Sequence, residues 1–439
     1  MKNSAPAGNI KRQNWLGNLP DGWATKRLKY VSTINDETLP ETTDPDYEML
    51  YVDIGSVDAT EGIQKKELMI FETAPSRARR VVQDGDTIIS TVRTYLRAVA
   101  PIQNPEENLI VSTGFAVIRP KGIAPHYLSY CLRSSYFIET VVSRSVGVSY
   151  PATNPTDVSC IELPLPPLDK QQTIARFLDA KTAQIDALVA QKRQLITKLK
   201  EKRSALIARA VTRGLPPEAA KAAGLAPNPE MQNAEEGWIG EMPIHWKAKK
   251  GRHLGRLIGS VAPAEEDITE DEDGVPYAKV DDLNFLDSSL RLTYTKVRLQ
   301  CAPPRWNTIV LFPKRGAAIF TNKVALAHRV TFDSNLLGWE IHKSSDPKFV
   351  AYCLIARRLD DLADVSTVPQ INNKHIYPAK FPHPPKSEQE AIVVFLDSAT
   401  TRIDQLVGNV EGAIDRLTEY RQALITSAVT GKIDVRELA

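Results

Sequence analysis

The segment from Pro164 to Thr212 reads PLPPLDKQQTIARFLDAKTAQIDALVAQKRQLITKLKEKRSALIARAVT, and the segment from Pro382 to Thr430 reads PHPPKSEQEAIVVFLDSATTRIDQLVGNVEGAIDRLTEYRQALITSAVT. The two segments align without a gap at an offset of 218, and 23 of the 49 positions are identical. A second match lies upstream, where WLGNLPDGW (residues 15–23) parallels WIGEMPIHW (residues 238–246) at an offset of 223. Because self-similarity at a fixed spacing marks a repeated structural unit, the chain is predicted to contain two copies of one unit.

The interiors of the two copies differ in sequence and in length, since the two offsets differ by five residues. Similar ends around dissimilar interiors favour one scaffold that presents two different surfaces. Ordinary drift after duplication is the alternative, but drift gives no reason for the ends to stay closer than the middles.

The two matching segments are predicted to be long helices that pair as a coiled coil. Apolar residues recur every seven positions, which is the pattern of a coiled-coil seam. No proline lies between Asp169 and Thr212 or between Lys386 and Ala439, so each helix can run for about 42 residues, or roughly 60 Å. The predicted seam residues are Leu178, Ile185, Val189, Ile196, Leu199 and Leu206 in the first helix and Leu396, Ile403, Val407, Val410, Ile414, Leu417 and Leu424 in the second.

A seam of about five heptads is too long to be covered by a globular core, so the natural partner of each helix is the other copy. An internal duplication favours an antiparallel pair with pseudo-twofold symmetry. Arg203 and Arg421 occupy matching seam positions, where they either specify the pairing or extend their charged ends into solvent.

The interiors are predicted to be mixed β-rich domains with a few helices, because short apolar runs such as GDTIISTVR and NTIVLFPKRG alternate with turn residues. The predicted fold is therefore α+β, with two such domains joined by the two long antiparallel helices. The expected boundaries are 1–163 for the first domain, 164–214 for the first long helix, 215–236 for a linker, 237–381 for the second domain and 382–439 for the second long helix.

The composition excludes several classes of protein. The 439 residues carry a formal net charge of +2, which excludes a polybasic protein but not a local basic face. Four widely spaced cysteines predict neither a disulfide framework nor a zinc site, and no metal ligands are expected. The sequence has no apolar run of about 18 residues and begins with a polar segment, so a cytoplasmic location is expected.

Charge is nevertheless segregated along the chain. From Arg291 to Arg329 there are eight Lys or Arg residues and no Asp or Glu, and Arg77 to Arg97 holds five Arg and two Asp. Such stretches favour a surface that binds a polyanion, and Arg, Lys and Asn side chains on loops suit phosphates and base edges. The candidate DNA-binding residues are Arg77, Arg79, Arg80, Arg93, Arg97, Tyr150, Arg298, Lys314, Arg315, Asn322, Lys323, Gln370 and Asn372.

No motif predicts catalysis. A phosphate-binding loop with Gly-Lys-Ser/Thr and a Gly-x-Ser-x-Gly element do not occur in the sequence, and the seven histidines show no ligand-like spacing. The segment from Asn154 to Asp157 lacks the second proline and the aromatic residue of an adenine methyltransferase motif. Two acid-x-Lys elements, at Asp179 and Asp346, are explained by chance, so the chain is not expected to be an enzyme by itself.

The duplicated arrangement resembles the specificity subunit of type I restriction–modification systems. The resemblance rests on PLPPLDKQQTIARFLD and PHPPKSEQEAIVVFLD, on the shared ending LI..AVT, on the WIGxxPxxW opening, and on STGFAVIRP (112–120) and FPKRGAAIFTN (312–322) inside the variable regions. It covers nearly the whole chain, with one small departure, since the first copy has Lys170 where the second has Glu388.

The resemblance implies that each variable region is a target recognition domain that reads one half of a bipartite double-stranded DNA site. It implies that the helices act as a spacer and as a docking site for two methyltransferase subunits, with restriction and translocase subunits joining the full complex. No cofactor is expected on this chain, while S-adenosylmethionine, ATP and Mg²⁺ are expected on the partners. The main alternative is a non-enzymatic coiled-coil scaffold with incidental nucleic-acid contact; a fused restriction–methylation enzyme is disfavoured by the missing motifs.

Overall fold

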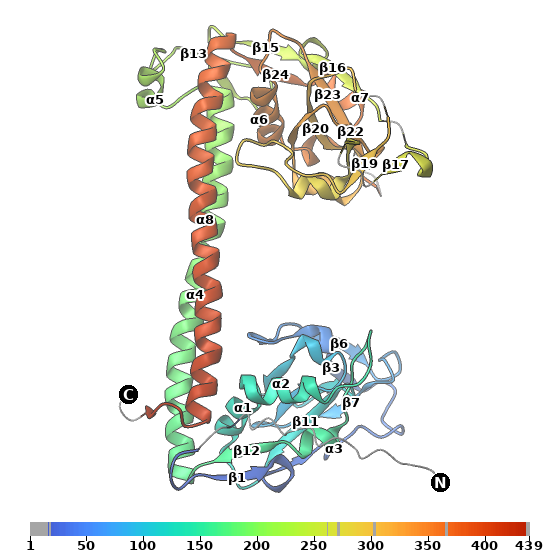
Figure 1. Cartoon of the computed structure of the whole chain (residues 1–439), viewed down its shortest axis with the longest axis vertical. Helices are drawn as coiled ribbons and strands as arrows, with labels where there is room; N and C mark the ends of the chain where they lie inside the picture. Colours follow the sequence, from blue (N-terminus) through green and yellow to red (C-terminus); the bar gives the residue numbers. More distant parts are fainter. Residues whose placement is uncertain are drawn as a thin grey trace. The chain divides into compact units, whose positions relative to one another are not determined.

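The computed structural model describes residues 16, 19–260, 262–269, 273–301, 304–364 and 368–435. The chain divides into two compact units, of which unit 1 comprises Met1–Lys192 with Gly412–Ala439 and unit 2 comprises Arg193–Glu411. Both boundaries fall inside the two long helices, so each helix contributes one half to each unit (Figure 1).

Unit 1 contains two four-stranded sheets, of order β2-β11-β8-β9 and β6-β3-β10-β7. All neighbouring strands in these sheets are antiparallel except β3 and β10. A short pair, β1 with β12, and a hairpin, β4 with β5, complete the unit. The strands are β1 Ala24–Arg27, β2 Ser32–Ile34, β3 Glu48–Val52, β4 Val57–Asp58, β5 Gly62–Ile63, β6 Glu67–Ile70, β7 Ala78–Val81, β8 Thr87–Ser90, β9 Val99–Pro101, β10 Leu109–Ser112, β11 Phe115–Pro120 and β12 Glu162–Leu165. Its short helices are α1 Pro125–Arg133, α2 Ser135–Ser143 and α3 Pro155–Ser159.

Unit 2 repeats this plan. Its sheet of order β16-β23-β20-β21 matches β2-β11-β8-β9, and its second sheet, β17-β19-β18-β22, again holds one parallel pair, β18 with β22. The strands are β13 Met231–Asn233, β14 Glu241–Pro243, β15 Lys247–Lys250, β16 Gly255–Ile258, β17 Ile268–Thr269, β18 Val275–Ala278, β19 Val297–Leu299, β20 Thr308–Pro313, β21 Ala325–His328, β22 Thr331–Phe332, β23 Leu336–Ile341 and β24 Lys380–His383. The short helices are α5 Pro217–Ala222, α6 Pro347–Arg357 and α7 Asn373–Ile376. The repeat therefore extends into the interiors, where the first sheets share one strand order. The second sheets differ at an edge, since β7 pairs with β10 in unit 1 whereas β17 pairs with β19 in unit 2.

The long helices are α4, Leu168–Arg213, and α8, Lys386–Val429, of 46 and 44 residues. Within unit 1 the first half of α4 packs with the second half of α8, and within unit 2 the remaining halves pack together, so the pair is antiparallel. The expected α+β fold with two β-rich domains and two long antiparallel helices is thus confirmed (Figure 1).

Two ion pairs fix the same register in both units. Arg421 donates to Asp186 at 2.9 Å in unit 1, and Arg203 donates to Asp404 at 3.0 Å in unit 2. Each pair joins α4 to α8, and the partners occupy equivalent repeat positions. Of the two readings of Arg203 and Arg421, the structure supports cross-helix pairing over extension into solvent.

The seam residues lie on the covered side of the helices, and each of them is buried or half-buried. Leu178 and Leu396 are fully buried, as are Ile207 and Ile425 near the helix ends. In contrast, Leu188 and Leu406, which stand one position before Val189 and Val407, are exposed. The seven-residue period therefore identified the packed stripe.

A glutamine in the first turn of each long helix ties that helix to its domain. The Gln171 side chain accepts from Ala124 N at 2.9 Å and donates to Pro166 O at 2.8 Å. The Gln389 side chain accepts from Asp346 N at 2.8 Å and donates to Pro384 O at 2.8 Å. Both glutamines are buried, so each satisfies one backbone N–H at the start of α1 or α6 and one carbonyl just before its own long helix, groups that would otherwise be costly to bury.

The tryptophans that end the upstream motifs pack against the glycines that end the long helices. The Trp23 ring lies beside Gly431, and the Trp246 ring lies beside Gly214. Both glycines have positive φ, 71° and 83°, as helix-terminating residues commonly do. The first two positions that the two motifs share, Trp15 and Gly17 in the first motif, lie outside the described residues. In the part of the chain that is described, no helix is long and apolar enough to cross a membrane.

Candidate DNA interface

In each unit, a loop that contains a short 3-10 helix joins two neighbouring strands of the first sheet, β8 and β9 in unit 1 and β20 and β21 in unit 2. We call these the tip loops, residues 91–97 in unit 1 and 314–322 in unit 2. The 3-10 turns are Thr94–Leu96 and Ala317–Thr321. Both are flanked by left-handed residues, Arg93 and Arg97 in unit 1 and Gly316 and Asn322 in unit 2.

A second segment braces each tip loop. We call these the clamp segments, residues 150–154 (YPATN) and 368–372 (VPQIN), which are equivalent at the offset of 218. Thr153 N donates to Thr91 O at 2.9 Å, and Ile371 N donates to Lys314 O at 2.8 Å. Isolated bridges join Val92 to Ala152 and Arg315 to Gln370. The same frame is thus built twice from different side chains.

Each clamp segment ends in an asparagine that caps a short helix. The Asn154 side chain accepts from Asp157 N at 2.8 Å, and the Asn372 side chain accepts from Lys374 N at 3.1 Å. The segment from Asn154 to Asp157, which resembled a broken methyltransferase motif, is therefore the start of α3. A capping side chain fixes where the helix begins and so where the preceding clamp segment lies.

Left-handed backbone at arginine is strained, because the Cβ of an L-residue crowds the following carbonyl. Arg93 and Arg97 both have φ of 54°. Strain of this kind, of order 1–3 kcal/mol per residue, persists where the surroundings fix the conformation, and it clusters at functional sites. The Arg93 guanidinium lies 5.1 Å from the centroid of the exposed Tyr150 ring, so the tip loop and its clamp segment share a cationic, aromatic surface.

The structure brings together three of the six candidates in unit 1. Arg93, Arg97 and Tyr150 lie on the tip loop and clamp segment, although Arg97 also pairs with Glu139 at 2.6 Å. Arg77, Arg79 and Arg80 lie on or beside β7, in the other sheet.

The three β7 arginines have partners inside the domain. Arg77 donates to Asp53 at 3.1 Å and to the Tyr51 hydroxyl at 3.2 Å, which raises the pKa of Arg77. Arg79 lies 4.2 Å from the centroid of the Phe71 ring, and Arg80 donates to Thr38 at 3.0 Å. Burial lowers the pKa of Arg80. These contacts tie all three side chains to the body of the domain.

In unit 2, six of the seven candidates lie at one end of the hairpin that β20 and β21 form. They are Lys314, Arg315, Asn322, Lys323, Gln370 and Asn372. Asn322 is fully engaged internally, since its side chain donates to Ile355 O at 2.9 Å and accepts from Leu359 N at 3.0 Å. Lys323 donates to the Asn284 side chain. The seventh, Arg298, lies apart on β19 and donates to Gly274 O at 2.8 Å.

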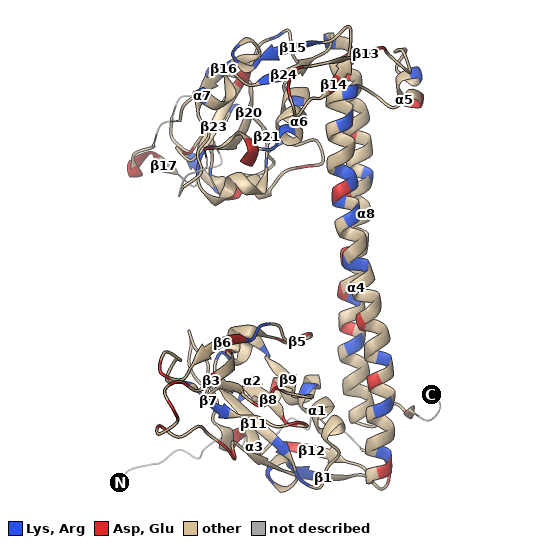
Figure 2. Cartoon of the chain, turned by 180° about the vertical axis from the view of Figure 1, so that it is seen from behind, with Lys and Arg blue, Asp and Glu red and all other residues tan. Residues whose placement is uncertain are grey.

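The eight basic residues between Arg291 and Arg329 do not form one surface. Lys314, Arg315 and Lys323 lie at the turn end of the β20–β21 hairpin, whereas Arg305 and Arg329 lie at its opposite end, beyond the six residues of β20. Six strand residues span roughly 20 Å. Lys and Arg are also present over both long helices, interspersed with Asp and Glu (Figure 2). The basic residues that are relevant to DNA binding in this stretch are therefore the ones gathered at the tip loop of unit 2.

Sequence reasoning missed the exposed apolar residues around both tip loops. In unit 1 these are Tyr95, Leu96, Val146 and Val148, and in unit 2 they are Phe285, Tyr294, Phe320 and Val368. Phe285 and Tyr294 stack edge to face, with centroids 5.4 Å apart, beside the Lys323–Asn284 contact. Their sequence signal is indistinguishable from that of core residues, because a short apolar run does not reveal which side of a sheet or loop it occupies.

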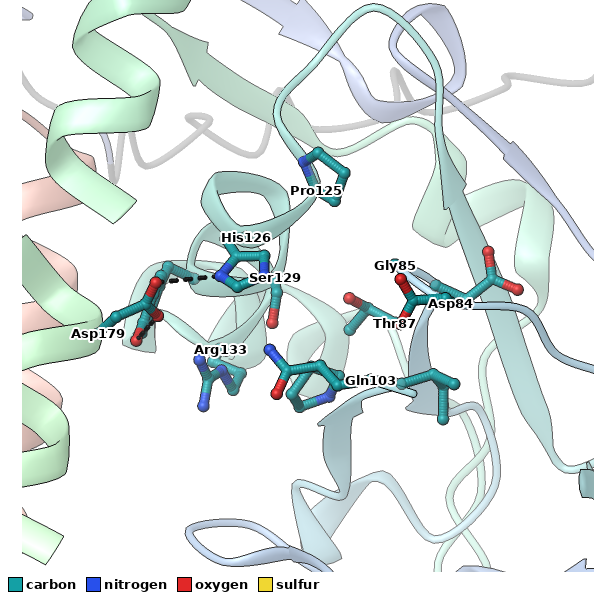
Figure 3. A pocket seen from close by; sticks show the side chains of 13 residues that line it. Asp84, Gly85, Thr87, Gln103, Pro125, His126, Ser129, Arg133 and Asp179 are labelled. Atoms are coloured by element: carbon teal, nitrogen blue, oxygen red, sulfur yellow. Dashed lines mark hydrogen bonds and ion pairs between the residues drawn. The ribbon is translucent and has the colours of Figure 1, made fainter. Parts of the chain in front are cut away.

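A polar pocket of about 170 Å³ lies in unit 1 where α1 meets α4 and the ends of β8 and β9 (Figure 3). His126 and Tyr130 both contact Asp179, at 3.0 and 2.7 Å. Three atoms in its lining, Thr87 Oγ1, Ser129 Oγ and Arg133 Nε, have no protein partner. Burial lowers the pKa of Arg133 and raises that of Tyr130.

This pocket has the size and polarity of a site for a few water molecules, which would complete those hydrogen bonds. Within the described ranges, no group of three or more His, Cys, Asp or Glu side chains is placed to hold a metal ion. The two acid-x-Lys elements have structural roles, since Asp179 binds Tyr130 and Asp346 caps α6.

The chain matches one family model, described as the type I restriction modification DNA specificity domain, over residues 20–198. It is 24% identical to the type I restriction enzyme MjaIX specificity subunit of Methanocaldococcus jannaschii, over 96% of each chain. It is 26% identical to the type I restriction enzyme StySPI specificity subunit of Salmonella potsdam, over 45% of this chain and 44% of that protein. A solved chain from a study of complex assembly and conformational transition in a type I R-M system has a similar fold, with a TM-score of 0.73, 23% identity and coverage of 95% of this chain and all of that one.

Proposed function

Because the chain belongs to the family of type I restriction–modification specificity subunits, we propose that each unit reads one half of a bipartite DNA target with its tip loop and clamp segment. The chain supplies sequence recognition, and the chemistry resides on other subunits. This agrees with the names of the relatives, which are specificity subunits.

The observation that carries the proposal is the repeated frame at the tip loops. The contacts between Thr153 and Thr91 and between Ile371 and Lys314 are equivalent, but the side chains that the two frames present differ. Unit 1 presents Arg93, Tyr150 and nearby valines, whereas unit 2 presents Arg315 and Gln370. Arg and Gln pair with guanine and adenine edges in the major groove, so different side chains on one frame select different bases.

The antiparallel helix pair is proposed to set the gap between the two half-sites. A helix of 46 residues is roughly 69 Å long. The cross-helix ion pairs and the buried glutamines make each helix end and its domain one packed body. A rigid helix would then fix the number of base pairs between the half-sites.

The outer face of the helix pair is proposed to dock two methyltransferase subunits. Leu188 and Leu406 are equivalent repeat positions, and both are exposed, by 46% and 51%. Two identical apolar positions on two equivalent helices suit two copies of one partner. S-adenosylmethionine, ATP and Mg²⁺ are proposed to bind those partners and the restriction subunits, and the complex is proposed to act in the cytoplasm.

The experiment is to co-express the chain with the methyltransferase subunit and to map methylated adenines across the host genome by sequencing. A two-part motif with a fixed gap is expected. A scaffold with incidental nucleic-acid contact, the alternative function, would give methylation without a motif or none at all, and that outcome would remove the proposal.

A further inference from the structure

Three large apolar side chains project from unit 1 beside its tip loop, and we call them the apolar tip. Val148 is 100% exposed, Val146 is 82% exposed and Tyr150 is 62% exposed. Clustered apolar side chains on a surface mark a contact with another molecule more often than isolated ones do.

The turn that carries the valines is held in one shape. Val146 N donates to Ala152 O at 2.9 Å, and Ala152 N donates to Val146 O at 3.0 Å. Gly147 between the valines has φ of 115°, and a Cβ there would lie 3.2 Å from Tyr150 O. Only glycine accepts this backbone without strain. The turn therefore holds the valines in an exposed conformation before any partner binds, and less conformational entropy is lost when a partner contacts them.

The surroundings of the apolar tip are cationic. Residues 87–105 and 140–156 contain no Asp or Glu, and they include Arg93, Arg97 and Arg144, of which Arg97 pairs with Glu139 just outside these stretches. Arg93 stacks on Tyr150, and Arg144 donates to the backbone carbonyl of Asp157, so neither of these contacts pairs the guanidinium with a carboxylate. A small apolar patch surrounded by basic residues is complementary to a partner that is anionic overall and carries a small apolar group.

Duplex DNA offers that combination at the thymine methyl. The 5-methyl group is the apolar feature of the major groove, and apolar side chains recognise thymine by contact with it. A valine is short and branched, which suits contact with a methyl group better than insertion between stacked bases. We propose that Val148 of the apolar tip contacts the 5-methyl group of a thymine in the half-site that unit 1 reads.

This inference rests on the proposed function, and its test begins with the methylation motif. The half-site of unit 1 is the half that changes when residues 30–160 are exchanged for those of a related subunit. The purified complex of chain and methyltransferase is then titrated with duplexes in which each thymine of the motif is replaced in turn by deoxyuridine, which lacks only the methyl group.

One deoxyuridine in the half-site of unit 1 is expected to weaken binding by about fourfold, the value for one buried carbon. Replacements in the other half-site are expected to leave affinity unchanged. The variant Val148→Ala is expected to bind thymine and deoxyuridine duplexes equally. The variant Leu68→Ala, at a 67% exposed residue of β6 in the same unit, is expected to keep the full discrimination.

A half-site of unit 1 without any A·T pair, or one in which every deoxyuridine is silent, overturns the inference while leaving DNA reading intact. Loss of methyltransferase binding in Val148→Ala, with discrimination unchanged, also overturns it and assigns the apolar tip to a protein contact. Methylation without any motif instead removes the proposed function on which the inference rests.

Discussion

The Tyr130 hydroxyl donates a hydrogen bond to Asp179 at 2.7 Å, and so fastens α1 of unit 1 to the long helix α4. Unit 2 repeats the contact, since the Tyr352 hydroxyl donates to Asp397 of α8 at 2.7 Å. Both carboxylates accept from a second group one turn earlier on the short helix, His126 in unit 1 and Lys348 in unit 2. Burial is the main cause that raises the pKa of both tyrosines, so both stay protonated and able to donate.

Tyr130→Phe is expected to destabilise unit 1 by about 1–2 kcal/mol, because Asp179 loses a hydrogen bond in a half-buried position. The measurement is urea unfolding followed by tryptophan fluorescence. Tyr30→Phe, at an exposed tyrosine of the same unit, is the matched control and should leave the midpoint unchanged. Equal shifts in the two variants would show that the contact with α4 contributes nothing.

Binding of the DNA target should weaken steeply with salt, with a log–log slope near −0.9 per phosphate neutralised. Arg315→Gln, at the tip loop of unit 2, is expected to relax recognition of one half-site only and to lose about 1–3 kcal/mol of discrimination. Arg305→Gln, at the far end of the same hairpin, serves as the control. Loss at both half-sites with Arg315→Gln would contradict independent reading by the two units.

Exchanging residues 30–160 for the same region of a related subunit should change one half of the methylation motif. The other half and the gap should persist, because the second tip loop and the long helices are unaltered. Methylation mapping of the chimera gives the answer. A change in both halves would mean that the two interiors are coupled.

Insertion of four residues near Arg193 should lengthen the helix pair by about 6 Å, or one to two base pairs of DNA. The seam is also disturbed, since four residues do not fit a seven-residue repeat. We expect a longer gap between unchanged half-sites or a failure of assembly. An active variant with the original gap would show that the helices do not set the spacing.

Leu188→Glu and Leu406→Glu should each remove one of two bound methyltransferase subunits, because each places a charge in an apolar contact. The readout is the subunit ratio by native mass spectrometry. Leu68→Glu on β6 is the control and should retain both partners. If the variant that carries both Leu188→Glu and Leu406→Glu still bound two methyltransferase subunits, the docking surface would lie elsewhere.

The long helices and their seam could be predicted from the sequence because a seven-residue apolar period is a local signal. Ile185 and Ile403 repeat at the same place in both copies, and nothing distant is needed to recognise them. The charged candidates were harder to place, because their surroundings depend on residues far along the chain. Arg77 meets Asp53 across 24 positions. Arg315 meets Gln370 across 55 positions, and only the second contact brings its residues to a tip loop.

Of the apolar tip, Tyr150 was a predicted candidate, but the two valines could not be predicted, because their local pattern is that of another structure. Val146 and Val148 alternate with Gly147 and Ser149 as residues of a half-buried strand would, and the sequence contains no sign that this alternation lies at an exposed turn. Their exposure depends on the pairing of Val146 with Ala152 and on the bracing of the clamp segment by Val92.

Unit 1 is built from two segments that are far apart in the sequence, residues 1–192 and 412–439, and this has a consequence for folding during synthesis. Its core includes Leu424, Ile425, Ala428 and Val429 of α8, which are synthesised after unit 2, whereas unit 2 is one continuous stretch from Arg193 to Glu411. The unit whose synthesis begins first therefore closes its core only after the second half of α8 has been made, while unit 2 can close earlier. During that interval the first half of α4 exposes its apolar stripe, and this nascent segment is where chaperones and premature self-association would compete.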